Sequence, residues 1–305
     1  MISQSRELDV MKTQKSFFCI VLLLTLLSCS STDTSWSKEK VLKNKAEKNL
    51  SGTGYREFEG KMINYDYVDF GSFRLAVFDN KIKWRGYGGY FDGVVAQVNP
   101  QISRVADGIY FMSWTFEMGG GDNVCVNFNT KKVYAHLHQA DADMLEDFEV
   151  IHGDITCGPS VECAFPEGEV MGQFSTIFTI LKNIIKFDLP FMGQTERPLT
   201  EQNQLARKEL KGKKLQYKTE STVVTIEVKG DVTQVTYKGE ETKNYLSYVT
   251  KISDGIYFIS WLGDPQFSDH IVLNANDSVV FDQLSKSGEH REKIYEVLCF
   301  GEHCK

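Results

Sequence analysis

Apolar and polar residues alternate in short runs along most of the chain, which is the pattern of half-buried β-strands. In one run, Phe73, Leu75 and Val77 share a face, and turn residues such as Asp79-Asn80 separate one run from the next. Between about residue 60 and residue 155 the pattern predicts strands at Lys61–Val68, Ser72–Phe78, Ile82–Tyr87, Val94–Val105, Ile109–Phe116, Asp122–Asn129, Val133–Gln139 and Phe148–Ile155.

The same arrangement occurs a second time. The run DGIYFMSW at Asp107–Trp114 returns as DGIYFISW at Asp254–Trp261, an offset of 254 − 107 = 147 residues. Between 105–129 and 252–276, 10 of 25 positions are identical, so the chain is a tandem duplication. We expect the offset to continue to Cys157 against Cys304. The second copy is predicted to form strands at Leu215–Thr219, Val223–Lys229, Val232–Tyr237, Tyr245–Ile252, Ile256–Trp261, Ile271–Asn274, Val279–Gln283 and Ile294–Leu298.

Eight short strands with hairpin turns favour an up-and-down sheet that closes into a barrel, because closure removes the exposed edges. We therefore predict an all-β dominated chain of two tandem eight-stranded barrels, at 55–165 and 213–305, joined by a helical linker at 166–212. The linker carries an apolar helical period in Phe174–Phe187 and a polar helix in Thr200–Leu210. The apolar helix is expected to pack across the modules or to plug a barrel mouth.

The N-terminal segment is typical of export. Lys12 and Lys15 precede the apolar run Phe17–Leu27, which ends at Cys29 as in a bacterial lipobox. We predict a lipoprotein signal peptide at 1–29, with Met11 as the possible true start, lipidation of Cys29 and a flexible tether at 30–54. Ser30, at the second position after cleavage, favours sorting of the lipoprotein to the outer membrane, where the chain is expected to face the periplasm. The alternative is an ordinary secretory signal with an incidental cysteine.

Charge and cysteine content agree with this location. The net charge of −7 and the lack of a basic patch argue against nucleic acid as a partner. In an oxidising compartment, two closely spaced pairs predict local disulfides, and a zinc site is the alternative. These pairs are Cys157 with Cys163 and Cys299 with Cys304. Cys125 lies in an apolar run and is predicted to be a buried free thiol.

Strand parity gives a candidate ligand pocket in the first module. Tyr65 and Tyr67 share one face of the first strand, and alternate residues of the DGIYFMSW strand share another. An eight-stranded barrel has room for side chains or for one small ligand. The predicted pocket, suited to a small hydrophobic or aromatic molecule, is lined by Tyr65, Tyr67, Tyr110, Met112, Trp114 and Phe116. The alternative is a barrel filled by these same side chains.

A second candidate site is His136-Leu137-His138, because two histidines at this spacing lie on one face of a strand and can begin a zinc or copper site. The second copy has Gln283 and Ser285 at these positions, so the duplication does not preserve the pair. A solvated strand end is the alternative. We predict no cofactor.

The run RGYGGYFDGVVAQ at Arg85–Gln97, followed by DGIYFMSW and DNVCVNFN, resembles the calycin-like barrel of phenolic acid decarboxylases and of MoaF-like proteins. The tandem arrangement is more similar to the MoaF-like family. The resemblance covers about 60–140 and 245–285 and implies two calycin- or lipocalin-like barrels.

Within this resemblance, Tyr65 and Tyr67 match the Tyr-x-Tyr pair that holds the substrate carboxylate in the decarboxylases. Their arginine has no match in Asp92–Val95, and their glutamate is replaced by Phe116 and, in the second copy, by Gly263. We therefore expect a ligand-binding protein and not an enzyme. The alternatives are a divergent decarboxylase-like lyase and a structural envelope protein with filled barrels.

Overall fold

The computed structural model describes residues 54–115, 121–138, 149–190, 200–262, 267–286 and 289–304. The predicted signal peptide with Cys29, and the tether as far as residue 53, lie outside the described residues. The described part is dominated by antiparallel β-strands, and it belongs to one unit, Trp36–Lys305.

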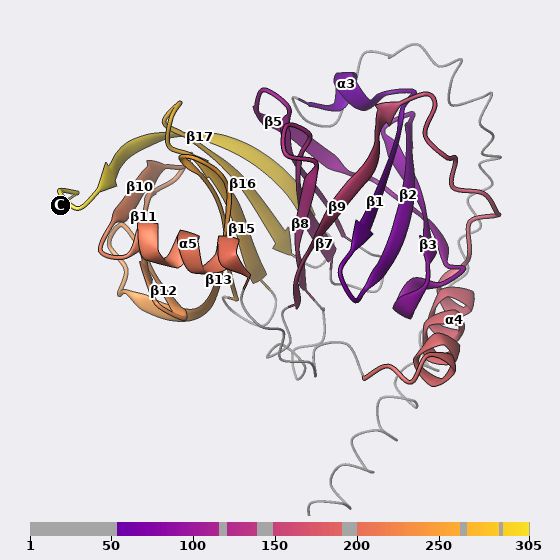
Figure 1. Ribbon diagram of the computed structural model, residues 1–305. Helices are drawn as coiled ribbons and strands as arrows, with labels where there is room; N and C mark the ends of the chain where they lie inside the picture. Colours follow the sequence, from indigo (N-terminus) through magenta and orange to yellow (C-terminus); the bar gives the residue numbers. More distant parts are fainter. Residues whose placement is uncertain are drawn as a thin grey trace, which may run out of the picture. The chain divides into compact units, whose positions relative to one another are not determined.

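The first module is a curled antiparallel sheet in the order β4-β3-β2-β1-β9-β8-β7-β6-β5 (Figure 1). Apolar side chains alternate along its strands, so that one face builds a core around Ile63, Leu75, Tyr110 and Met112. Its strands are β1 (Met62–Tyr67), β2 (Gly71–Phe78), β3 (Lys81–Tyr87), β4 (Val95–Val98), β5 (Gln101–Ala106), β6 (Ile109–Thr115), β7 (Gly121–Asn127), β8 (Lys132–His138) and β9 (Glu149–Ser160).

The second module is a closed eight-stranded barrel. Leu215, Ile226, Ile259 and Leu273 belong to its own core. Its strands are β10 (Lys214–Lys218), β11 (Val223–Lys229), β12 (Val232–Tyr237), β13 (Lys243–Ser253), β14 (Ile256–Leu262), β15 (Phe267–Asn274), β16 (Val279–Lys286) and β17 (Glu289–Gly301).

The first module differs from the predicted eight-stranded barrel at one place. Its two edge strands, β4 and β5, are consecutive in the chain and are separated by Asn99-Pro100, where a single strand was expected. In the second module the equivalent β13 is continuous, and the backbone N–H of Ser247 donates to Asp231 O at 3.0 Å. Pro100 occupies the position of Ser247 and has no N–H to donate. The strand is therefore broken in the first module and whole in the second.

The linker helices each pack on one module. In α4 (Gln173–Lys186), the buried Asn183 donates to two carbonyl groups of the first module: Tyr90 O at 3.0 Å, within the short 3-10 helix η1 (Gly89–Phe91), and Asp92 O at 2.8 Å, directly after it. Ile180 and Ile184 of the helix pack against the core of the first module, so of the two expected roles the packing across the modules is wrong. Its other side leaves Phe178 65% and Ile185 83% exposed. Neither α4 nor any other described helix has the length and apolar character needed to cross a membrane.

The other two helices precede the first strand of each module. In α5 (Glu201–Leu210), Thr200 and Asn203 form a capping box, and Leu210 packs into the second barrel. The single turn α3 (Tyr55–Phe58) holds the same place before β1. Helix α5 was predicted from the sequence. Helix α3 was not, because four residues are too few to show a helical period.

The duplicated Asp-Gly sequence forms a hairpin turn. Gly108 and Gly255 have φ of 67° and 72°, a region that favours glycine, and a Cβ at either position would collide with an asparagine side chain. That asparagine, Asn129 or Asn276, donates to the carbonyl of the turn's aspartate, at 2.8 Å and 2.9 Å. The repeated Asp-Gly pair is therefore explained by turn geometry.

The outer faces of the two modules share a third apolar cluster with internal symmetry. Its ten buried residues form five pairs, each separated by the duplication offset of 147 residues. The pairs are Val105 with Ile252, Ile109 with Ile256, Phe111 with Phe258, Cys125 with Val272, and Tyr134 with Phe281. The predicted burial of the Cys125 thiol is confirmed. A surface that meets its own copy in this way is isologous, as in a two-fold symmetric dimer.

Two asparagines repeat this symmetry in hydrogen bonds. Asn127 Nδ2 donates to Ile252 O at 3.0 Å, and Asn274 Nδ2 donates to Val105 O at 2.8 Å. Each side-chain oxygen also accepts two backbone N–H groups of its own turn, at 3.0–3.2 Å for Asn127 and 3.1 Å for Asn274. Both buried amides therefore hold a turn and the module interface together.

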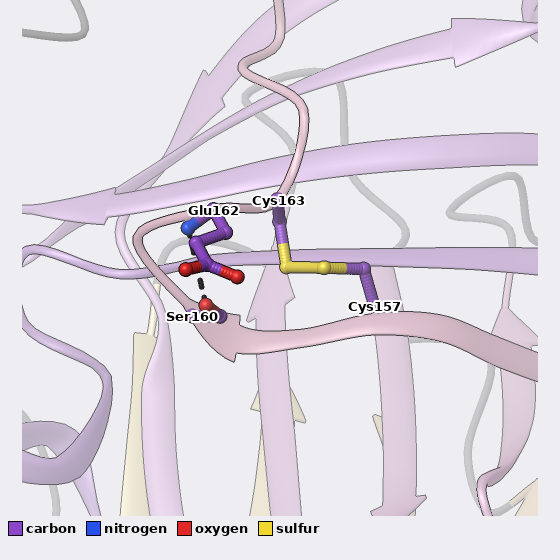
Figure 2. Close-up of a disulfide and its surroundings, with 4 residues drawn as sticks. All are labelled: Cys157, Ser160, Glu162 and Cys163. Atoms are coloured by element: carbon purple, nitrogen blue, oxygen red, sulfur yellow. Dashed lines mark hydrogen bonds between the residues drawn. A yellow bond between two sulfur atoms is a disulfide. The ribbon is translucent and has the colours of Figure 1, made fainter.

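Both predicted disulfides are present. Cys157 is bonded to Cys163, and Cys299 to Cys304, with Cα–Cα distances of 5.6 and 5.7 Å. Figure 2 shows the first of them, beside a turn in which Glu162 N donates to Ser160 Oγ at 3.1 Å. The zinc alternative for these cysteines is excluded by the sulfur–sulfur bonds.

The expected equivalence of Cys157 with Cys304 is wrong. In the register of the sheets, Cys157 lies opposite Asn64 on β1, and Cys299 lies opposite Gln216 on β10. The offset has therefore fallen from 147 to 299 − 157 = 142 residues. Ten residues separate β8 from β9, against two between β16 and β17, which have also lengthened, so the loss of register lies in this hairpin.

Candidate functional site

A small cavity lies inside the first module, where the inward faces of its strands meet. Its volume is about 20 Å³, which is room for little more than one water-sized group. The lining is almost entirely aromatic or aliphatic, with one carboxyl group. It consists of Tyr65, Tyr67, Phe70, Phe73, Trp84, Phe91, Trp114, Asp122, Leu137 and Ile151.

The aromatic rings pack against one another around this cavity. The centroids of Tyr65 and Tyr67 lie 4.9 Å apart with the rings inclined at 61°, and Tyr67 lies 5.7 Å from Phe73. Phe73 in turn lies 5.8 Å from Trp84. These separations are those of favourable edge-to-face and tilted pairs. The interior is therefore a packed aromatic shell around a small space.

Asp122 supplies the ionisable group of the cavity. It is only partly buried as a residue, but its carboxyl faces the cavity, and Trp114 Nε1 donates to Oδ2 at 3.0 Å. Loss of hydration raises the pKa of Asp122 to about 7, and the Trp114 hydrogen bond opposes that shift. At neutral pH this group can therefore exist in either protonation state.

The two tyrosine hydroxyls lie close to this carboxyl in electrostatic terms. Burial raises the pKa of Tyr65 far above its ordinary value, and the charge of Asp122 raises it further. The pKa of Tyr67 is raised by burial first, then by Tyr65 and by Asp122. The Tyr67 hydroxyl is buried without a hydrogen-bond partner of normal geometry. A buried donor left in this way favours occupation of the cavity by a polar group.

The structure brings together part of the predicted pocket. Tyr65, Tyr67 and Trp114 line the cavity, whereas Tyr110 and Met112 are buried in the same core without lining it. Phe116 lies outside the described residues. Trp84, Phe70, Phe73, Phe91 and Asp122 were not predicted.

Tyr110 has a structural role at another part of the module. Its hydroxyl donates to Glu57 of α3, and Arg104 pairs with the same carboxylate at 3.2 Å. The second module repeats the arrangement, with Tyr257 and Lys251 each 2.7 Å from Glu209 of α5. Hydrogen bonding to the glutamate and burial raise the pKa of Tyr110 to about 12, with burial the larger cause. The repetition shows that this group holds the helix against the sheet of its own module.

Asp122 could have been found from the sequence by following the register across one hairpin. In the structure it lies directly opposite Trp114 on the neighbouring strand. The predicted strands stop at Phe116 and resume at Asp122, but the glycine run between them did not fix how they pair, so the register was open. The equivalent Asp269 belongs to β15, but its side chain lies outside what the structure describes.

The candidate metal ligand His136 is placed at the module interface. Its Nδ1 lies 2.6 Å from Ser260 Oγ and its Nε2 lies 2.9 Å from Thr250 Oγ1, while the ring stacks on Phe258 at 3.7 Å. Both ring nitrogens thus face hydroxyls of the second module, which corrects the metal-site hypothesis for this residue. The side chain of His138 is not described, and in the described part of the chain no group of three potential ligands is arranged for a metal.

The second module has a different interior. Tyr217 occupies the position of Tyr65, since each lies on the first strand one residue after the site opposite Cys299 or Cys157. Two residues further on, Thr219 stands in place of Tyr67. Tyr217 stacks on Tyr295 at 5.7 Å and donates to Asp282 Oδ2 at 3.4 Å. The Tyr-x-Tyr pair therefore belongs to the first module.

Comparisons with known proteins add little. No protein-family model matches the chain, and no curated protein matches it. Among solved structures, the chain is similar to one named "putative beta-lactamase" from Burkholderia vietnamiensis, at 18% identity and a TM-score of 0.28. The match covers 31% of this chain and 89% of the other. At this TM-score we draw nothing from it about fold or activity.

Proposed function

We propose that this protein is an exported lipoprotein that binds a small hydrophobic or aromatic ligand inside its first module. The observation that carries the proposal is the aromatic cavity, which is lined by the Asp122 carboxyl and by two buried groups without a hydrogen bond of normal geometry, the Tyr67 hydroxyl and Trp84 Nε1. Binding pockets are commonly apolar with a few placed polar groups. In this proposal both modules are calycin-like barrels of the MoaF-like type, anchored through Cys29 to the outer membrane and facing the periplasm. Catalysis is not part of this function.

The size of the cavity limits how a ligand enters. About 20 Å³ accommodates the polar head of a ligand but not an aromatic ring. A ring therefore has to displace side chains such as Leu137 or Phe70, and its affinity is reduced by the cost of that displacement. Fragments with a small polar head are the best first probes.

A thermal-shift panel of small aromatic acids, alcohols, amines and fatty acids tests the proposal on the full chain. We expect at least one class to raise the midpoint of unfolding in proportion to the logarithm of its concentration. The variant Tyr67→Phe is expected to weaken that shift, and Tyr217→Phe in the second module serves as the matched control. If no member of the panel shifts the midpoint, ligand binding in the first module is refuted.

A second candidate is a lyase that transfers a proton from Asp122. It is favoured by one observation, a carboxyl with a pKa of about 7 beside Tyr65 and Tyr67, which suits a general acid at neutral pH. The lining contains no arginine to hold a substrate carboxylate, so we rank it second. Incubation with hydroxycinnamic acids distinguishes the two, because a lyase releases carbon dioxide and loses that activity in Asp122→Asn.

A further inference from the structure

We propose that the polar head accepted by the first module is a primary ammonium group, so that the ligand class is a small aromatic or aliphatic amine. This inference rests on the proposed function and narrows it. The juxtaposition that carries it is a single carboxyl group, Asp122, inside a shell of aromatic rings that contains no cationic side chain.

Charge is the first step. The lining includes Asp122 and neither a lysine nor an arginine, and the Asp122 carboxyl accepts a hydrogen bond from the neutral indole of Trp114. A ligand carboxylate would meet a like charge unless Asp122 were first protonated. A ligand ammonium would instead supply the opposite charge in a poorly hydrated site, where ion pairing is strong.

The aromatic shell is the second step. The cavity is lined by seven aromatic residues: Tyr65, Tyr67, Phe70, Phe73, Trp84, Phe91 and Trp114. The faces of aromatic rings carry negative electrostatic potential and attract cations, with tryptophan the most effective. Anions gain nothing from such faces. A carboxylate within an aromatic shell is therefore chemically matched to a cation.

Size and hydrogen bonding are the third step. A primary ammonium is about as large as water and donates three hydrogen bonds, and a cavity of about 20 Å³ has room for it. Asp122 and the buried Tyr67 hydroxyl, which makes no hydrogen bond of normal geometry, are available acceptors. A trimethylammonium group is larger than this space and donates none. The cavity therefore favours primary over quaternary amines.

Three ligands with the same ring test the proposal: benzylamine, benzyl alcohol and benzoate, titrated into the full chain by calorimetry. We expect benzylamine to bind about tenfold more tightly than benzyl alcohol, with benzoate weakest. Benzyltrimethylammonium is expected to bind more weakly than benzylamine. Because the three ligands share one ring and differ in charge, the differences between their affinities report on the polar head and not on the fit of the ring.

The pH dependence gives a second readout that needs no variant. A bound cation stabilises the ionised carboxyl, so amine affinity is expected to rise between about pH 6 and about pH 8, on either side of the Asp122 pKa of about 7. An anion binds with proton uptake, so benzoate affinity would fall over the same range. Asp122→Asn is expected to weaken benzylamine about tenfold and to leave benzyl alcohol within about twofold. Asp154→Asn, at the exposed pair with Lys132, is the matched control.

The outcomes separate the two proposals. If benzoate binds more tightly than benzylamine, or if amine and alcohol bind equally, the ammonium inference is overturned while ligand binding stands. If none of the three binds, the proposed function fails and the inference fails with it. If Asp122→Asn leaves benzylamine binding unchanged, the ammonium does not meet this carboxyl and the inference is wrong.

Discussion

The ring of Phe111 packs against the ring of Phe258, with centroids 5.3 Å apart and planes inclined at 60°. The two residues occupy the same position in the two copies of the module, so the contact lies at the centre of the symmetric interface. Both are fully buried. Because the two rings are equivalent in the two copies, substitutions at these positions measure how much the module interface contributes to stability.

Replacing either phenylalanine by alanine is expected to lower the free energy of unfolding by about 3–5 kcal/mol, because a large buried ring leaves a cavity. The double variant is expected to lose less than the sum of the two, since each loss includes the same contact. Chemical denaturation gives both values. Phe178→Ala on the exposed side of α4 is the control and should stay within about 0.5 kcal/mol of wild type. Fully additive losses at 111 and 258 would contradict the contact.

Asn127→Ala is expected to destabilise the chain by about 1–3 kcal/mol, because it leaves buried groups of the turn and of the second module unsatisfied. Asn274→Ala should have a similar or larger effect, since Asn274 makes the equivalent bonds and also donates to Asp277 Oδ2 at 2.8 Å. The comparison variant is Asn129→Ala, because the bonds of Asn129 to Asn127 and to Asp107 both stay within the first module. Equal effects of Asn127→Ala and Asn129→Ala on unfolding would show that the cross-module bond contributes nothing.

His136 predicts acid sensitivity. Burial lowers the pKa of its imidazole from the ordinary value of 6.5 to about 3 in the folded chain. The folded state therefore favours the neutral ring. The contribution of the neutral ring to the free energy of unfolding is complete above about pH 6.5 and is lost as the pH falls toward about 3. The slope is up to about 1.4 kcal/mol per pH unit. His136→Gln, which does not titrate, is expected to flatten this part of the stability profile. An unchanged profile in that variant would refute the assignment.

Asp122 predicts the opposite dependence of stability on pH, with stability falling as the pH rises. Its pKa is raised from 3.8 to about 7, so folding favours the protonated carboxyl. This contribution is complete below about pH 3.8 and is lost as the pH rises to about 7. Asp122→Asn keeps a side-chain acceptor for Trp114 and removes the titration, so we expect it to raise stability at about pH 8 by one to a few kcal/mol. Denaturation at about pH 4 and about pH 8 measures the difference, and a variant less stable than wild type at both would contradict it.

Much of the fold followed from the sequence because its causes are local. Strand alternation, the Asp-Gly turns and the closely spaced cysteines are each set within a few residues, and all three were predicted in place. The break at Pro100 was missed because a single strand pattern runs through it. Pro100 breaks the strand because it lacks the backbone N–H that would bond to the neighbouring strand. Which strand is the neighbour depends on strand pairing, and the alternation of residues does not reveal that pairing.

The site was predicted less well because it depends on register and depth. Strand parity placed Tyr65, Tyr67 and Trp114 on the inward face. It could not show that Trp114 lines the cavity whereas Tyr110, on the same face, is bonded to Glu57. Asp122 requires the pairing of two strands across a glycine run. The role of His136 requires the position of the other module, and no pattern within one copy contains that information.

The reciprocal bonds of Asn127 and Asn274 bear on how the two copies could diverge. A self-complementary dimer of identical chains must accept every substitution twice, on both sides of the interface and in both interiors. Joining the copies into one chain removes that restriction. Here the shared surface has stayed matched, whereas the first interior carries Tyr67 and the equivalent position of the second copy is Thr219, whose hydroxyl bonds within a turn. One copy could thus keep its interior chemistry while the other was released from it, as long as both continued to hold each other.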